Sequence, residues 1–350
     1  MTIANGMTMK AATMKAMAVV DYDGPLRLVD VPLPERGPGD VLVRIRYCGV
    51  CGSDVKISRG QMGFSADLPL PHVAGHEIVG VVAEAGSDVP LRPGSRVVVY
   101  DYETCGCCPS CRAGRETTCG SLRRRIGFTH AGGFAEGIVV PWQLAVPLPD
   151  AINDRSASAL SCAIATAFRA VVTRGQIAFG ERVLVSGAGG VGIHAAQIAR
   201  ARGAQVVASD PSVTARRMAE SLGLATKDPA APGAGKRVDA RFDAVIETSG
   251  DPATIARLVP LLNPGGRIVI VGYLPGRLSE IDAEALVLAE VAVLGSRFAT
   301  REDLLAAVEL VASGAIRSVV TEEFALGDAN QALAAVGAGR ATGRVTVRVS

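Results

Sequence analysis

The sequence predicts a two-domain α/β protein, in which a β-rich domain accompanies a doubly wound parallel sheet with helices on both faces. The chain has 350 residues, enough for two domains of ordinary size. Near residue 155 the pattern changes from short strands between Gly, Pro and Asp turns to strands that alternate with helices. A glycine-rich turn at residues 187–192 joins a strand to a helix, as parallel sheets that bind nucleotides require.

The first part of the chain has the patterns of short strands. Residues 41–47 alternate apolar and charged side chains, which is the period of a strand with one buried face. Residues 78–82 and 96–100 are further strand candidates. No helical period holds for long before about residue 155, so we expect a mostly antiparallel domain. Residues 1–13 are expected to form a flexible extension, because a strand-like run begins only near Ala16.

The second part alternates strands and helices. The predicted strands are residues 183–185, 206–208, 244–246, 268–271 and 291–293, followed by helices over 301–313 and 328–338 and a last strand over 344–349. We expect a β-rich domain from residues 14–155 and 298–350, with a cysteine-rich lobe at 101–120. The domain built on the parallel sheet is expected to occupy residues 156–297.

Composition narrows the class of protein. Apolar residues make up 49% of the chain and the net charge is only +2, which fits a globular protein and gives no reason to expect nucleic acid or a membrane as partner. No apolar run has the length of a membrane span or a signal peptide, so a cytoplasmic protein is expected. Five of the eight cysteines fall within residues 105–119. Without a secretory signal, such clustering favours metal binding over disulfides.

The glycine turn predicts a dinucleotide site. Gly187 permits a tight turn, Gly189 lets the backbone approach a pyrophosphate, and Gly192 lets helix and strand pack closely. Asp210 ends the next strand, where a carboxylate binds an adenosine ribose and repels a 2′-phosphate, which favours NAD over NADP. The alternatives are a turn that serves packing alone and an Asp210 that caps a strand. Arg216 and Arg217 would weaken the preference if either reached a 2′-phosphate.

Two groups of residues have the character of metal ligands. Cys105, Cys108, Cys111 and Cys119 have the spacing C-x2-C-x2-C-x7-C, which suits a closed four-thiolate structural zinc site. A disulfide or redox pair is the alternative, and Cys107 is left outside because the even spacing works without it. Cys51-Gly-Ser-Asp54 and Gly75-His-Glu77 supply two ligands of the kind that an open catalytic site uses, although either alone could be a buried core residue.

Together these motifs resemble the zinc-containing medium-chain alcohol dehydrogenase family of the medium-chain dehydrogenase/reductase superfamily. The resemblance rests on residues 49–54, 75–77 and 132–136, on the four-cysteine lobe, and on the glycine turn with Asp210. The order of the motifs agrees over residues 14–350. The resemblance implies a GroES-like catalytic domain beside a Rossmann domain, two zinc ions per chain, and association as a homodimer or homotetramer.

The resemblance also implies roles for single residues. Cys51, His76 and Cys162 would hold the catalytic zinc, although Cys162 could instead be a small buried helix residue. Ser53 would relay the alcohol proton, Asp54 would orient His76, and Glu77 would lie beside the metal. The residues expected to bind the cofactor are Gly187, Gly189, Gly190, Val191, Gly192, Asp210, Thr166 and Gly272.

The chemistry of these residue types is consistent with alcohol oxidation. Zinc is a Lewis acid that acidifies a bound hydroxyl, and a serine hydroxyl can both accept and donate a proton. Lys56 stands where some members end the relay with a histidine, so the proton would leave through Lys56, the cofactor ribose or water. Cys48 lies three residues before Cys51, but only Cys51 is followed by the relay serine. His194 and His130 have no evident partners, and Phe64 and Tyr100 are candidates for an apolar substrate wall.

We therefore expect a zinc-dependent, NAD-linked dehydrogenase that acts reversibly on a primary or secondary small-molecule alcohol or its aldehyde or ketone. Simple alcohols are weakly favoured by the family likeness. Alternatives within the family are a polyol or threonine-type dehydrogenase and a zinc-assisted carbonyl reductase. A zinc-free reductase of the superfamily and an inactive NAD-binding structural protein are the remaining alternatives, and the intact ligand set disfavours both.

Overall fold

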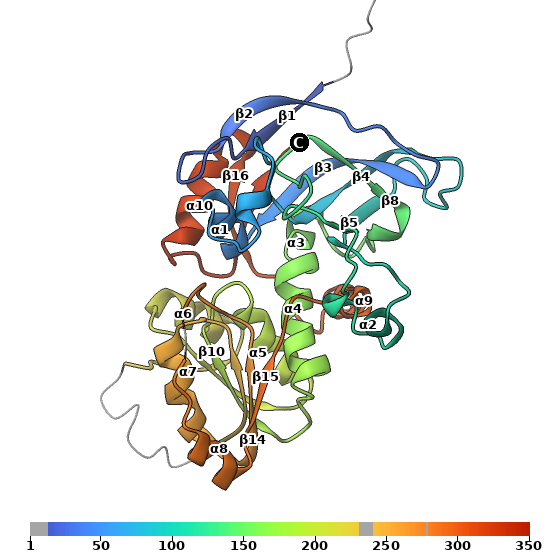
Figure 1. Cartoon of the computed structure of the whole chain (residues 1–350). Coiled ribbons are helices and arrows are strands. Elements are labelled where there is room, and N and C mark those ends of the chain that lie inside the picture. Colours follow the sequence, from blue (N-terminus) through green and yellow to red (C-terminus); the bar gives the residue numbers. More distant parts are fainter. Residues whose placement is uncertain (1–12, 231–240, 278) are drawn as a thin grey trace, which may run out of the picture.

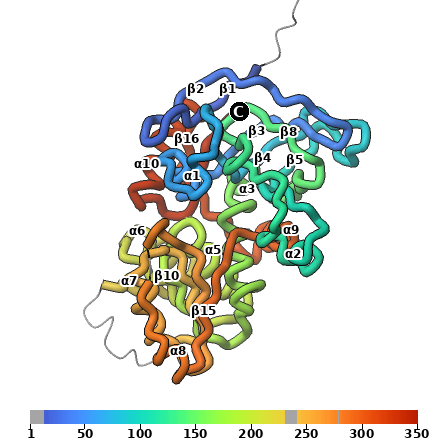
Figure 2. The backbone as a smooth tube through the Cα atoms, in the orientation of Figure 1, coloured from blue at the N-terminus to red at the C-terminus, as the bar shows by residue number. Residues whose placement is uncertain are grey.

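The computed structural model describes residues 13–230, 241–277 and 279–350. A β-rich lobe, which holds the C-terminus, lies above a lobe built on a parallel sheet (Figure 1). The chain leaves the upper lobe through green helical segments and returns to it in red (Figure 2). The extension expected at 1–13 lies outside the described residues, except that Thr13 already begins the first strand.

The upper lobe is organised around a seven-stranded sheet with the order β16-β17-β3-β4-β5-β9, in which β8 also pairs with β3. Its pairs are antiparallel except β16 with β17, as expected for this part of the chain. The strands of this sheet are β3 Asp40–Val50, β4 Glu77–Ala85, β5 Arg96–Val99, β8 Gly137–Pro141, β9 Ala145–Pro147, β16 Val320–Ala325 and β17 Arg344–Arg348. Two small sheets pair β1 Thr13–Ala18 with β2 Arg27–Pro32, and β6 Tyr102–Glu103 with β7 Arg124–Arg125.

The lower lobe is a six-stranded, fully parallel sheet with the order β12-β11-β10-β13-β14-β15. Counted from β10, this order is that of a doubly wound dinucleotide-binding fold, whose ligand site lies where the winding reverses. The prediction of this fold is confirmed. The strands are β10 Arg182–Ser186, β11 Gln205–Ser209, β12 Ala225–Lys227, β13 Phe242–Glu247, β14 Leu262–Ile270 and β15 Ala292–Gly295.

Each face of the parallel sheet has its own core because side chains alternate along a strand. In β10, Val183 and Val185 belong to the main core of the protein, whereas Leu184 packs on the other face with Ile255 and Leu258 of α7. Helices on both faces account for the near-continuous apolar strands of this part of the sequence.

Both parts of the chain contain short helices, and the longest described α-helix is α9, with 12 residues. They are α1 Gly52–Ser58, α2 Pro109–Arg112, α3 Asp154–Ala157, α4 Ala165–Phe168, α5 Gly192–Ala201, α6 Val213–Ser221, α7 Pro252–Leu258, α8 Ala283–Ala289, α9 Arg301–Ala312 and α10 Ala329–Gly337. Tighter 3₁₀ turns are η1 Ser65–Asp67, η2 Glu116–Thr118, η3 Trp142–Leu144, η6 Val259–Leu261 and η7 Leu326–Asp328. Wider π-type turns, η4 Leu160–Ile164 and η5 Arg169–Arg174, flank α4. Within the described ranges, no helix combines the length and the apolar character needed to cross a membrane.

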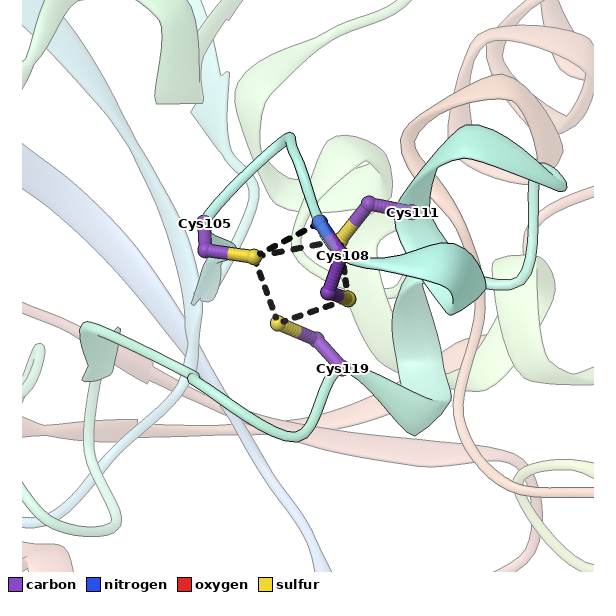
Figure 3. A group of neighbouring side chains, drawn as sticks. All are labelled: Cys105, Cys108, Cys111 and Cys119. Carbon is purple, nitrogen blue, oxygen red and sulfur yellow. Dashed lines mark hydrogen bonds between the residues drawn. The ribbon is translucent and has the colours of Figure 1, made fainter.

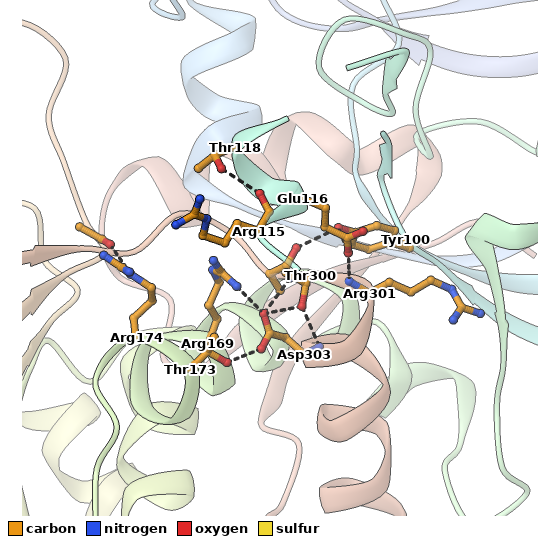
Figure 4. A network of polar contacts seen from close by, with 12 residues as sticks. Tyr100, Arg115, Glu116, Thr118, Arg169, Thr173, Arg174, Thr300, Arg301 and Asp303 are labelled. Carbon is orange, nitrogen blue, oxygen red and sulfur yellow. Dashed lines mark hydrogen bonds and ion pairs between the residues drawn. The ribbon is translucent and has the colours of Figure 1, made fainter. Parts of the chain in front are cut away.

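A network of polar contacts joins the two lobes where the chain crosses back into the upper one (Figure 4). Glu116 accepts a hydrogen bond from the backbone N–H of Arg301, the first residue of α9, and Tyr100 Oη lies 3.1 Å from the same Glu116 oxygen. In the same first turn of α9, Asp303 pairs with the buried Arg169 guanidinium at 2.9 Å. The crossing is therefore fixed by a carboxylate at a helix N-terminus, a favourable place for a negative charge.

Candidate functional site

Four thiols of residues 105–119 converge beside α2 (Figure 3). Around the ring Cys105–Cys119–Cys108–Cys111 the Sγ–Sγ separations are 3.5, 3.9, 3.5 and 3.9 Å. With zinc–sulfur bonds of about 2.3 Å, a tetrahedral ion holds its sulfurs about 3.8 Å apart. The four residues therefore fit a closed tetrahedral metal site.

The backbone around these thiols favours thiolates. The N–H groups of Cys107 and Cys108 lower the pKa of the Cys105 thiol to about 6. The Cys107 side chain is exposed and lies outside the group of four, as the spacing of the cysteines predicts. Short-range backbone geometry thus selects four of the five neighbouring cysteines.

A second group brings together residues that are far apart in the sequence. The ligand atoms of Cys51, His76, Glu77 and Cys162 all lie within 4.8 Å of one another. Cys51 precedes α1, His76 precedes β4, Glu77 opens β4, and Cys162 lies in η4. Two sulfurs and an imidazole are a ligand set typical of catalytic zinc, which binds three protein ligands.

Asp54 holds two members of this group in place from the first turn of α1. Its Oδ2 accepts a hydrogen bond of 2.8 Å from the Cys51 N–H, and its Oδ1 lies 3.2 Å from His76 Nδ1. This contact leaves Nε2 of the His76 ring to act as a ligand, which is the usual function of a carboxylate behind a metal-binding histidine. The sequence reasoning identified no helix at 52–58, because seven residues are too few to show a helical period.

The electrostatics of the group suit a cation. The Cys162 thiol donates a hydrogen bond to Cys51 and lowers the pKa of Cys51 well below its usual value. The same bond, together with burial, raises the pKa of Cys162. Burial opposes the charging of His76, but the Asp54 carboxylate and Cys51 together outweigh it and raise the pKa of this histidine. One proton shared between two sulfurs is readily displaced by a metal ion.

Arg344 belongs to the site, and the sequence reasoning missed it. Its guanidinium is buried at the start of β17, with Nη2 3.0 Å from Glu77 Oε1 and Nη1 3.3 Å from the Val50 carbonyl oxygen. Burial raises the pKa of Glu77 to about 7, and Arg344 opposes that rise. The alternation in β17 puts Arg344 on the polar face with Thr346 and Arg348, so the sequence pattern gave no signal that Arg344 is buried.

The glycine turn has the geometry expected of a phosphate-binding loop. Gly187 has a φ of +90°, which only glycine adopts readily. A Cβ on Gly192 would lie 1.8 Å from the Gly187 carbonyl oxygen, so helix α5 packs directly on the turn. A Cβ on Gly189 would meet no atom within 4 Å, so this side of the turn is open. The three glycines therefore have the separate roles that the fingerprint assigns to them.

Gly190, Val191 and Gly272, which were also expected at the cofactor, lie around this turn. Gly190 approaches Arg344, whose Nη1 would be 3.1 Å from an added Cβ, and Val191 caps α5. Gly272 packs so closely on the loop after β13 that an added Cβ would lie 2.5 Å from the Gly250 nitrogen. Thr166 lies one helical turn after Cys162, and its buried hydroxyl has no hydrogen-bond partner among the described residues.

Asp210 lies beside the turn, where its carboxylate accepts hydrogen bonds of 2.8 Å from the N–H groups of Ala188 and Ser212. Arg216 is held by the Pro211 carbonyl oxygen at 3.0 Å and by Asp228 at 3.0 Å, whereas Arg217 is exposed. The carboxylate is therefore pinned close to the open side of the turn.

Several weaker candidates have structural partners. His194 was expected to lack partners, but its Nδ1 lies 2.7 Å from the Gly190 carbonyl oxygen and its Nε2 accepts the Val319 N–H at 3.0 Å. The Lys56 ammonium donates a hydrogen bond of 2.9 Å to the Tyr273 carbonyl oxygen and lies over the Tyr273 ring. Ser53 is half-buried in α1, between Cys51 and Lys56.

Comparison with known families agrees with this arrangement. Residues 37–150 match the alcohol dehydrogenase GroES-like domain, and residues 190–313 match the zinc-binding dehydrogenase domain. These two matches correspond to the β-rich lobe and to the parallel-sheet lobe.

Individual relatives cover most of the chain. An alcohol dehydrogenase of Rhizobium meliloti (strain 1021) is 34% identical over 310 residues, 87% of this chain and 90% of the relative. The L-galactonate-5-dehydrogenase of Escherichia coli (strain K12) is 36% identical over 314 residues, 87% of this chain and 89% of the relative. Among solved structures, an NAD-dependent alcohol dehydrogenase is 30% identical with a TM-score of 0.91, over 96% of this chain and 100% of that structure.

Proposed function

The chain belongs to the zinc-containing medium-chain dehydrogenase family, and we propose that it is a zinc-dependent alcohol dehydrogenase that uses NAD. The observation that carries the proposal is the group of Cys51, His76 and Cys162, which supplies two sulfurs and an imidazole in one largely buried place. The Cys51–His76–Cys162 group has three such ligands, whereas the closed group of Cys105, Cys108, Cys111 and Cys119 has four thiols. We propose that the four-thiol group holds a structural zinc ion.

The residues in and around the Cys51–His76–Cys162 group have different proposed roles in alcohol oxidation. Cys51, His76 and Cys162 would hold zinc, which when bound supplies Lewis acidity toward the substrate oxygen. Asp54 keeps His76 in the orientation that a ligand needs. Glu77 places a carboxylate beside the group, and its ion pair with Arg344 reduces the cost of burying that charge.

The proton of the alcohol leaves through Ser53 in this proposal. A serine hydroxyl accepts one proton while it donates another, so it can pass the charge outward without becoming ionised itself. Lys56 is a less direct acceptor than the sequence suggested, because its ammonium is engaged by Tyr273. We therefore propose that the proton continues to the cofactor ribose or to water.

NAD would lie across the glycine turn, with its pyrophosphate against the open side of Gly189 and the first N–H groups of α5. Asp210 would accept the hydroxyls of the adenosine ribose and repel a 2′-phosphate. Thr166, one turn from Cys162, would lie against the nicotinamide, which takes up or releases the hydride. The buried Arg344 adds a positive charge on the other side of the turn.

We also propose that two copies of the chain associate through their parallel-sheet lobes. Strand β15 lies at the edge of the sheet, and Val293 on it is 38% exposed. On the neighbouring α8, Val287 and Leu288 are 74% and 78% exposed. An unpaired edge strand with exposed apolar neighbours is a surface that soluble proteins usually cover.

The experiment that tests the catalytic proposal counts zinc and measures turnover in matched alanine variants. Cys51→Ala should lose one zinc ion per chain and nearly all oxidation of alcohols by NAD, while the fold persists. Cys111→Ala should lose the other zinc ion and lower the unfolding temperature first. Cys107→Ala is the control, because this exposed thiol lies outside both groups, and it should retain both ions. A Cys51→Ala protein that keeps two zinc ions or full activity would contradict the proposal.

A further inference from the structure

A buried carboxylate without a hydrogen-bond partner among the described residues lies close to the Cys51–His76–Cys162 group. Asp101, between β5 and β6, is 0% exposed. Neither of its carboxylate oxygens has a hydrogen-bond partner among the described residues. Burial raises the pKa of Asp101 to about 7, and among the charged groups His76 and then Arg125 oppose that rise most. An orphaned carboxylate of this kind is costly unless something else binds it.

Backbone pairing places Asp101 beside the metal-binding side chains. The Ile126 N–H donates a hydrogen bond of 2.9 Å to the Asp101 carbonyl oxygen. Two residues further on, the ring of Phe128 packs on that of His76 with centroids 4.6 Å apart. The short β6–β7 pairing therefore holds Asp101 and Phe128 on neighbouring segments, next to a proposed zinc ligand.

The chain segment that contains Asp101 also reaches the crossing between the lobes. The ring of Tyr102, the next residue, stacks on Phe298 at 4.7 Å, and Phe298 lies just after β15 of the cofactor lobe. Ser296, two residues before Phe298, has a buried hydroxyl that also lacks a partner among the described residues. A substrate held between the metal group and the nicotinamide would lie in this region.

Arg125 adds an unsatisfied hydrogen-bond donor to the region around Asp101. Its guanidinium lies 3.4 Å from the centroid of the Phe128 ring and 5.1 Å from that of Tyr102. Its buried Nε has no hydrogen-bond partner among the described residues. Two aromatic rings thus flank an unsatisfied donor, and an unsatisfied acceptor lies on the neighbouring segment. Simple aliphatic alcohols would satisfy neither group.

We propose that Asp101 is a specificity-determining residue whose carboxylate accepts a hydrogen bond from a second hydroxyl of the substrate, so that the enzyme prefers diols and other polyhydroxylated alcohols. This inference rests on the proposed function. It differs from the weak preference for simple alcohols that the family likeness gives. A site built to bind a hydroxyl rejects the analogue without it, because its buried groups are then left unpaired.

A neutral hydroxyl fits this region better than a charged group. The positive charges of Arg125 and Arg297 act on Asp101 and would repel a substrate ammonium group. The Asp101 carboxylate in turn would repel a substrate carboxylate close to it. A hydroxyl can donate to Asp101 and accept from Arg125 without adding a charge.

The experiment compares pairs of substrates that differ by one hydroxyl group, with NAD as the oxidant. The pairs are 1-butanol with 1,2-butanediol, and cyclohexanol with cis-1,2-cyclohexanediol. The measured quantity is the ratio of kcat/KM for the diol to kcat/KM for the alcohol. A hydrogen bond to a charged group contributes enough for a preference of roughly tenfold to hundredfold. The wild-type ratio should lie in this range.

Two Asp101 variants and a control distinguish an effect on substrate specificity from an effect on folding. Asp101→Leu should lower the ratio by roughly tenfold or more, and Asp101→Asn by less, because an amide still accepts one hydrogen bond. Both variants should unfold near the wild-type temperature, since the Asp101 carboxylate makes no hydrogen bond to a described residue that either change would remove. Asp88→Asn, at an exposed carboxylate in the loop between β4 and β5, should keep the wild-type ratio.

Two results would overturn the inference. One is a wild-type enzyme that oxidises the alcohol and the diol of each pair equally well. The other is a set of Asp101 variants that slow every substrate by the same factor and unfold at lower temperature, as a structural residue would. A wild-type protein with zinc bound that oxidises no substrate with NAD or NADP would instead refute the proposed function.

Discussion

Protonation of the buried His194 should destabilise the protein as the pH falls. His194 is fully buried in α5, and burial lowers its pKa from 6.5 to about 4. Its contacts indicate the neutral ring with the proton on Nδ1, because Nε2 accepts the Val319 N–H. A proton on Nε2 would point directly at that N–H group. The folded protein therefore favours neutral His194.

The lowered pKa of His194 determines the direction and the size of the pH effect on stability. Because the folded pKa lies below the unfolded value of 6.5, the stabilisation is complete above pH 6.5 and is lost as the pH falls through about 4. At about 1.4 kcal/mol per pKa unit, the shift corresponds to about 3 kcal/mol of unfolding free energy. Asparagine at this position can still donate to Gly190 but leaves the Val319 N–H unpaired, which costs about 1–3 kcal/mol near pH 7.

The assay is urea unfolding of the wild type and His194→Asn at a series of pH values from 7.5 to 4.5. Acidic residues and cysteine ligands titrate alike in both proteins, so the difference between the two curves isolates His194. The wild type should be more stable at pH 7, and its advantage should shrink by about 2–3 kcal/mol toward the acid end. His130→Asn, at an exposed histidine, serves as the control. If the two curves run parallel, His194 is not held neutral by the fold and the reasoning is wrong.

Two further predictions concern the cofactor lobe. Asp210→Asn removes the charge that would repel a 2′-phosphate, so the ratio of kcat/KM with NADP to that with NAD should rise roughly tenfold, the effect of about 1.4 kcal/mol; an unchanged ratio would show that Asp210 does not select the cofactor. Val293→Glu places a charge on the β15 edge and should convert the associated protein to monomers in light scattering. Leu28→Glu, at an exposed residue of β2, should not; a monomeric wild type would contradict the proposed interface.

The sequence alone predicted a structural feature wherever the residues that determine that feature lie close together along the chain. The glycine turn, the strand before it and the helix after it form one local unit, so the doubly wound sheet could be predicted and is confirmed. The four cysteines of the metal-binding lobe are equally local, and backbone N–H groups within the same loop separate Cys105 from Cys107. In both cases spacing alone carries the geometric information.

Helix α1 is an element that local sequence patterns could not predict. Residues 52–58 are too short to stand as a helix without tertiary contacts, because the nucleation cost is met by few hydrogen bonds. The structure supplies the missing contacts through Asp54, which binds the Cys51 N–H, the Gly75 N–H and the His76 ring. The helix is thus a consequence of the proposed metal site as much as its support, and no periodicity could have indicated it.

The residues that sequence reasoning missed are polar groups whose partners lie in distant segments. Arg344 of β17 pairs with Glu77 of β4, which is distant in the sequence. His194 links the glycine turn to Val319 in the other lobe. Asp101 stands between two tyrosines in a stretch that suggests a turn, and only the pairing with Ile126 places it near His76. A sequence pattern reports which side chains face a core, but it does not report whether a buried charge has a partner. Unpaired groups of that kind are the ones that a substrate can satisfy, so specificity is the property that the sequence reveals least.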